Sequence, residues 1–208
     1  RWTSQSLTNK TILVCSEQGV GDELLFSAYL PKLAPLAKRI IVETDPRLVP
    51  LFSRSFENLE IYPYSRRVSG TRVIYDYHWL KQCRVYPDLF VEAASLPYFL
   101  KETHKESVAI TPHLKDDINA TKVWKNRLKK ISNGKPLIGL FWRSSLYTND
   151  RKHFYPTIDL WQPILSLKNV KFLSLQFDDD SHDISLAKQL FGVNILKFDG
   201  INLRNDFD

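Results

Sequence analysis

Short apolar runs alternate with helix-like segments along the first third of the chain, and this alternation constrains the fold more than any other feature. The β-branched, apolar composition of buried strands occurs in residues 10–17 (KTILVCSE), 39–43 (RIIVE) and 59–63 (LEIYP). Apolar residues at helical spacing fill the two intervals, 23–38 and 46–56, and Pro31 and Pro35 should kink or restart the first helix. This order predicts a parallel, doubly wound sheet, and therefore an α/β fold with a Rossmann-like first lobe.

The pattern is weaker in the middle of the chain and then restarts. Residues 73–79 read as a fourth strand, 88–94 as a helix, and 119–131 as a basic amphipathic helix that ends at Ser132-Asn133-Gly134. Further strands are expected at 137–142, 170–176 and 193–198, with helices at 160–167 and 184–191. We therefore predict two domains: a complete N-terminal lobe with a connector helix, residues 1–134, and the beginning of a second Rossmann-like lobe, residues 135–208.

Composition excludes several classes of protein. With 208 residues, 43% hydrophobic and 25% charged, the chain is neither disordered, collagen-like nor a coiled coil. It has no apolar run of membrane-spanning length, its first residues do not resemble the h-region of a signal peptide, and its two cysteines, Cys15 and Cys83, suit a reducing compartment. We expect a cytoplasmic protein with at most peripheral contact with the inner membrane. The lack of methionine and the ending at 205–208 predict a fragment of a longer protein.

The segment 17–23 (EQGVGDE) at the first strand-to-helix junction is the strongest local signal, because doubly wound folds bind ligands there. Gly19 and Gly21, with Glu43 at the end of the second strand, partly match a dinucleotide fingerprint, but Leu24 replaces its third glycine. Asp22 has two interpretations. It caps the helix, or it serves as a general base whose charge the helix dipole stabilises.

Three blocks together resemble glycosyltransferase family 9, the heptosyltransferase-like enzymes, in particular bacterial members fused behind tetratricopeptide repeats. The blocks are EQGVGDELLFSAYLPKL, SLPYFL and IGLFWRSS…R…YPTIDLWQPIL…VKFLSLQ, in family order. The opening Arg1-Trp2 resembles the junction after such a repeat array. The resemblance implies a GT-B fold whose first lobe holds the acceptor and whose second holds a nucleotide-sugar donor, with no metal and no other cofactor.

The resemblance also implies roles for individual residues. Asp22 matches the acid that deprotonates the acceptor hydroxyl, and Gly19 and Gly21 let backbone approach the acceptor sugar. His78 resembles a family position that faces the acceptor, although a structural histidine is an equal alternative. The acceptor would be a glycan, a lipid-linked glycan such as lipopolysaccharide, or a protein. Transfer would invert the configuration of the sugar.

The donor side would be formed by the second lobe. Arg143 matches a position that neutralises the leaving diphosphate, and Arg151 is a second candidate for this role. Gln176, at the end of a strand, would hydrogen-bond the nucleotide or sugar. The alternatives are a surface ion pair for Arg143, a solvated loop around Arg151 and an amide satisfied by backbone for Gln176.

Other functions have partial signals in the sequence. The run Asp178-Asp179-Asp180 contains the D-x-D pattern of metal-dependent transferases, but acids before a helix are more typical of capping. The net charge of +6 and the basic helix at 119–131 suit nucleic acid, yet Trp124 lies on the apolar side of that helix, so we expect no nucleic-acid partner. The alternative to an enzyme is a non-catalytic Rossmann-like module that binds nucleotide, glycan or a protein.

Overall fold

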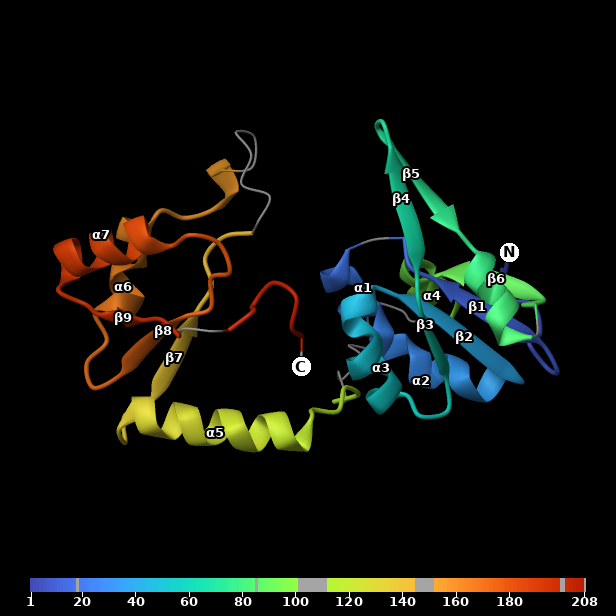
Figure 1. Ribbon diagram of the computed structural model, residues 1–208, viewed down its shortest axis with the longest axis horizontal. Coiled ribbons are helices and arrows are strands. Elements are labelled where there is room, and N and C mark those ends of the chain that lie inside the picture. Colours follow the sequence, from blue (N-terminus) through green and yellow to red (C-terminus); the bar gives the residue numbers. More distant parts are fainter. Residues whose placement is uncertain (18, 85, 101–111, 145–151, 199–200, 208) are drawn as a thin grey trace. The chain divides into compact units, whose positions relative to one another are not determined.

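The computed structural model describes residues 1–17, 19–84, 86–100, 112–144, 152–198 and 201–207. The chain forms two compact units, residues 1–117 and 118–207, and each has its own parallel sheet. Helices flank these sheets, so the predicted mixed α/β, Rossmann-like architecture is confirmed (Figure 1).

The first unit is built on a four-stranded parallel sheet with the order β3-β2-β1-β6. Its strands are β1 Thr11–Cys15, β2 Arg39–Thr44, β3 Glu60–Pro63 and β6 Leu89–Glu92. Strand β1 is central and fully buried, as its apolar sequence requires, and it pairs with β2 on one side and β6 on the other. The strand order therefore reverses between β1 and β6, which is where doubly wound sheets bind ligands.

Prolines divide the helical segments of this unit into short pieces. The segment after β1 is α1 Val20–Phe26, η1 Ser27–Tyr29, α2 Leu30–Leu33 and η2 Ala34–Leu36. Pro31 and Pro35 stand in the first turns of α2 and η2, where a missing N–H is tolerated, so the helix restarts at each proline, which is one of the two predicted outcomes. The segment after β2 is η3 Pro46–Leu48 and α3 Val49–Ser55. Leu30 and Phe52 pack on the sheet face of Val14 and Val42.

The other sheet face is covered without a long helix. A hairpin of β4 Ser65–Ser69 and β5 Arg72–Asp76 forms a separate antiparallel ribbon that projects from the sheet (Figure 1). It is followed by η4 His78–Cys83, whose Trp79 and Leu80 pack against buried Leu13 and Ile41.

Two expectations for this stretch are wrong. The strand predicted at 73–79 exists as β5, but it belongs to the hairpin and not to the parallel sheet. The helix predicted at 88–94 is strand β6, followed by η5 Ala93–Ser95 and α4 Leu96–Phe99. Pairing with β1 and the complete burial of Val91 override the local helical pattern there.

The second unit begins with helix α5, Ile118–Ser132, which the sequence analysis groups with the first lobe. Its sheet, in the order β7-β8-β9, is parallel and consists of β7 Leu137–Leu140, β8 Lys171–Ser174 and β9 Ile195–Leu196. The remaining helices are η6 Lys152–Phe154, η7 Ile158–Trp161, α6 Gln162–Leu165 and α7 Ser181–Phe191. A core around Leu140, Leu165 and Phe172 joins sheet and helices. Across the described residues, no helix has the length and apolarity to cross a membrane.

Candidate functional site

The carboxyl ends of β1 and β6 meet at the strand-order reversal of the first unit, and a carboxylate ties their loops together. Glu17, two residues beyond β1, accepts hydrogen bonds from the backbone N–H groups of Ala93 at 3.2 Å and Ala94 at 3.1 Å. Glu17 thereby caps η5, and the two loops form one edge.

Asp22 lies on this edge, in the first turn of α1. Its carboxylate accepts a hydrogen bond from Gly19 N at 3.3 Å and closes a capping box, so the capping interpretation describes its contact in the structure. The side chain is nevertheless exposed, and a Cβ placed on Gly21 would meet no atom within 4 Å. At this edge an accessible carboxylate, that of Asp22, lies next to backbone that no side chain of the described residues covers, that of Gly21.

Two buried glutamates lie behind the edge, and sequence reasoning missed the network that they form. Glu23 accepts hydrogen bonds from Ser16 Oγ at 2.6 Å, Thr44 Oγ1 at 2.5 Å and Asp45 N at 2.8 Å. Glu43 accepts one from Ser16 N at 3.0 Å, and burial, reinforced by the charge of Glu23, raises its pKa to about 7. Because Glu43 is only 3% exposed, it is not placed to bind a ribose, as the dinucleotide interpretation requires.

His78 lies at the start of η4, and its side chain is 78% exposed. Its Nδ1 pairs with Asp76, whose carboxylate also accepts a hydrogen bond from His78 N at 2.8 Å. Within the described residues, no hydrogen bond or ion pair links His78 to Asp22.

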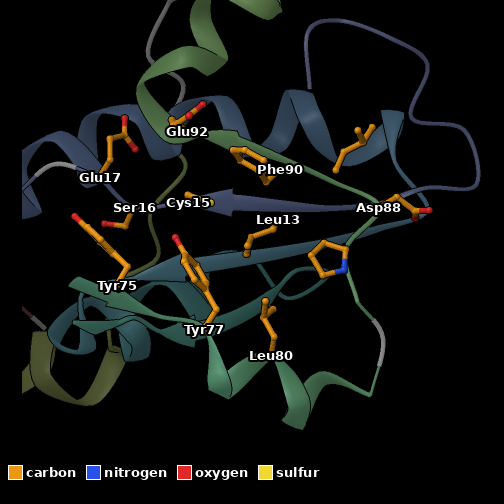
Figure 2. A pocket seen from close by; sticks show the side chains of 12 residues that line it. Leu13, Cys15, Ser16, Glu17, Tyr75, Tyr77, Leu80, Asp88, Phe90 and Glu92 are labelled. Carbon is orange, nitrogen blue, oxygen red and sulfur yellow. The ribbon is translucent and has the colours of Figure 1, made fainter. Parts of the chain in front are cut away.

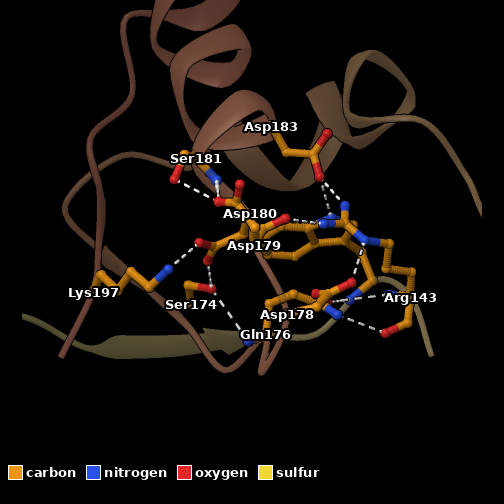
Figure 3. A network of polar contacts seen from close by, with 10 residues as sticks. Arg143, Ser174, Gln176, Asp178, Asp179, Asp180, Ser181, Asp183 and Lys197 are labelled. Carbon is orange, nitrogen blue, oxygen red and sulfur yellow. Dashed lines mark hydrogen bonds and ion pairs between the residues drawn. The ribbon is translucent and has the colours of Figure 1, made fainter. Parts of the chain in front are cut away.

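In the second unit, Gln176 follows β8 and is 2% exposed. Its Oε1 accepts hydrogen bonds from the N–H groups of Trp142 and Arg143, both at 3.3 Å, and its Nε2 donates to Arg143 O at 2.7 Å. The amide is thus satisfied by backbone, and it acts as a side-chain bridge between the ends of β7 and β8 (Figure 3).

The guanidinium of Arg143 is surrounded by acids of its own unit (Figure 3). It pairs with Asp178 at 3.0 Å and with Asp183, and it donates to the carbonyl of Asp179. Trp142 Nε1 adds a hydrogen bond to Asp183 at 2.9 Å. In this structure Arg143 therefore holds the loop between β8 and α7.

The three consecutive aspartates of this loop point to different partners. Asp178 pairs with Arg143, Asp179 accepts a hydrogen bond from Ser181 N at 3.0 Å in the first turn of α7, and fully buried Asp180 pairs with Lys197. In the part of the chain that the structure describes, no group of three His, Cys, Asp or Glu residues could hold a metal ion. Capping and pairing thus account for the D-x-D pattern.

Two cavities in the described part of the chain were not predicted from the sequence. A cavity of about 140 Å³ lies where β8 and β9 end, and its lining includes Lys197, Asn202 and Arg204. A larger cavity, about 370 Å³, lies in the first unit between the sheet and the end of the hairpin (Figure 2). Arg151 lies outside the described residues.

Comparison with known proteins gives one distant similarity. The chain is 29% identical, over its whole length, to the protein FlbA of Caulobacter vibrioides (strain ATCC 19089 / CIP 103742 / CB 15). It spans 35% of the length of that relative. No family model matches the chain, and no solved structure matches it.

Proposed function

We propose that this chain belongs to a glycosyltransferase of the GT-B type, which moves a sugar from a nucleotide-diphosphate donor to a glycan, lipid-linked or protein acceptor. The observation that carries the proposal is the exposed carboxylate of Asp22 at the strand-order reversal of the first sheet. The presence of a second parallel α/β unit in the same chain supports it, because the GT-B type divides its two substrates between two Rossmann-like lobes. We place the reaction in the cytoplasm, with at most peripheral contact with the inner membrane.

In the proposed reaction, Asp22 takes the proton of the acceptor hydroxyl as its oxygen attacks the anomeric carbon. A bond forms between that oxygen and the sugar, the bond to the diphosphate breaks, and the nucleotide diphosphate leaves with the electron pair, so the configuration inverts.

The negative charge of the leaving group requires cations in the second unit. Lys197 and Arg204 line the cavity at the ends of β8 and β9, and Lys197 is half-exposed although it pairs with Asp180. We assign these two residues to the diphosphate. Arg143 would act indirectly, by holding the loop between β8 and α7 in place.

Asp22→Asn tests the base without removing the cap, because an asparagine oxygen can still accept the hydrogen bond from Gly19 N. In the protein that carries this chain, we expect turnover to fall at least about 100-fold while donor affinity, measured by calorimetry, stays unchanged. Glu57→Gln, which removes an exposed carboxylate of the same unit, is the matched control. Unchanged turnover in Asp22→Asn would overturn the assignment of the base.

A non-catalytic binding module is the second candidate, and the internal satisfaction of Arg143 and Gln176 favours it. Calorimetric titration without added metal, against a panel of nucleotide diphosphates and their sugar conjugates, separates the two proposals. Binding of one conjugate, weakened by Arg204→Met, supports the transferase. No binding to folded protein supports the module.

A further inference from the structure

The larger cavity has the volume and construction of a small-molecule site. It encloses about 370 Å³ on the sheet face that carries Leu13 and Cys15, and the hairpin end and η4 form its opposite wall. This volume lies in the range of known ligand pockets, about 300–1,000 Å³. Asp22 and His78 are not among its lining residues, whereas Glu17, which belongs to the edge that carries Asp22, lines one end of it.

The walls of the cavity are mainly apolar and aromatic. Leu13 and Leu80 line its centre, and the rings of Tyr75, Tyr77 and Phe90 surround it from the hairpin side and from β6 (Figure 2). Phe90 is 41% exposed on its strand, which is unusual for a ring on a sheet face that is otherwise covered. Three rings around one space favour a flat or compact apolar body, and their faces attract a positive charge.

Carboxylates occupy the end of the cavity where the parallel strands end. Glu92 is the register partner of Cys15, and Glu17 follows two residues later, so both acids reach the same end (Figure 2). Glu92 pairs with Arg1 at 2.9 Å, whereas the described contacts of Glu17 are hydrogen bonds from backbone N–H groups. None of the described lining residues is Lys, Arg or His. An anionic ligand is therefore disfavoured, and a cation is favoured.

The remaining reactive group in the cavity is not a nucleophile. Burial raises the pKa of the Cys15 thiol to about 12, so the thiol stays protonated at neutral pH. The cavity is therefore better suited to reversible binding than to covalent chemistry on Cys15.

We propose that this cavity binds an organic cation, a protonated amine carried on an apolar body, with the amine at Glu17 and Glu92 and the body between Tyr75, Tyr77 and Phe90. The amine would lie beside the edge that carries Asp22, but none of the residues assigned above to glycosyl transfer lines the cavity. Its occupant contacts both β1 and the hairpin, so binding would stabilise the hairpin end against the sheet.

Three probes that share one apolar body and differ in their head group test which ligand charge the cavity prefers. Phenethylamine, phenethyl alcohol and phenylacetate are titrated into the protein that carries this chain, with binding followed by NMR or calorimetry. We expect the amine to bind at least about tenfold more tightly than the alcohol, as a charged hydrogen bond and cation–π contacts imply, and phenylacetate to bind most weakly. Equal affinity for amine and alcohol would overturn the proposed cation, and no binding of any probe would overturn the site.

Two variants place the probe within the cavity. Glu17→Gln should weaken the amine about tenfold and leave the alcohol unchanged, whereas Phe90→Ala should weaken both. Glu57→Gln, a carboxylate outside the cavity, should change neither. Thermal melting confirms that each variant is folded. Amine binding that survives both cavity substitutions would show that it occurs elsewhere. Because no probe contains a sugar or a nucleotide, failure here does not depend on the transferase proposal.

Discussion

The buried carboxylate of Glu43 makes the stability of the first unit depend on pH. Burial, with the charge of Glu23, raises its pKa from an ordinary value of 4.5 to about 7, against the opposing hydrogen bond from Ser16 N. At about 1.4 kcal/mol for each tenfold change in proton affinity, ionising Glu43 inside the fold costs about 3 kcal/mol. The pKa of Glu43 is higher in the folded than in the unfolded chain. The protonated carboxyl therefore makes its full contribution to the free energy of unfolding below about pH 4.5, and this contribution is lost as the pH rises through about 7.

Glu43→Gln removes this dependence, since glutamine does not ionise and its oxygen can still accept the hydrogen bond from Ser16 N. We expect the variant to match the wild type near pH 4.5 and to be more stable by up to about 3 kcal/mol above pH 7. Urea unfolding at a series of pH values, read out by hydrogen exchange in β1 and β2, measures the difference.

The control is Glu57→Gln. Glu57 is exposed and pairs with Lys115, which lowers its pKa, so its removal should give no gain at alkaline pH. If the free energy of unfolding differed between Glu43→Gln and the wild type by the same amount at every pH, the reasoning would be refuted. It would also be refuted if the wild type were more stable than the variant above pH 7.

Three further predictions concern single sites. Lys197→Met should destabilise the second unit by about 2 kcal/mol in urea unfolding, and by more than Asp180→Asn, because only the former leaves a fully buried carboxylate without its cation. Gly192→Ala should cost about 1 kcal/mol in thermal unfolding, and Gly192→Asn less, since this residue ends α7 at φ 65°. Native Cys15 should react with iodoacetamide far more slowly than in urea, as mass spectrometry would detect, because burial raises its thiol pKa to about 12.

The parts of the fold that were predicted correctly are those in which local pattern and burial agree. The run from Thr11 to Cys15 is apolar at every position except its first, and a central parallel strand buried on both faces requires this composition. The error at β6 has a long-range cause. Asp88 accepts a hydrogen bond from Thr11 N at 2.8 Å and Trp2 N donates to Phe90 O at 2.7 Å, and neither contact can be read from a local pattern.

The position of the glycine loop in the fold was predictable, but the contacts around it were not. The loop follows the first strand and precedes α1 at the strand-order reversal, as predicted, and Asp22 lies in the first turn of that helix. The hydrogen bonds of Glu23 depend on Ser16, which directly follows β1, lying beside Thr44 at the end of β2, and only the sheet order reveals this. The sequence did contain a signal for acids at this edge. Glu17 lies two residues beyond β1, and Glu43 lies near the end of β2. In the second unit, the partners of Arg143 were present in the sequence as 178–183, but that run was interpreted only as a cap or a metal motif.

The projecting hairpin has a consequence for how copies of the protein behave toward one another. Among the described strands, β4 and β5 pair only with each other, so the outer edge of each presents backbone groups to which a foreign strand could add. All five residues of β4 are exposed, and Val68 is 77% exposed. Arg66, Arg67 and Arg72 give the ribbon a positive charge, so two copies repel each other edge to edge. Salt shortens the range of that repulsion, and self-association through the ribbon should therefore increase with ionic strength.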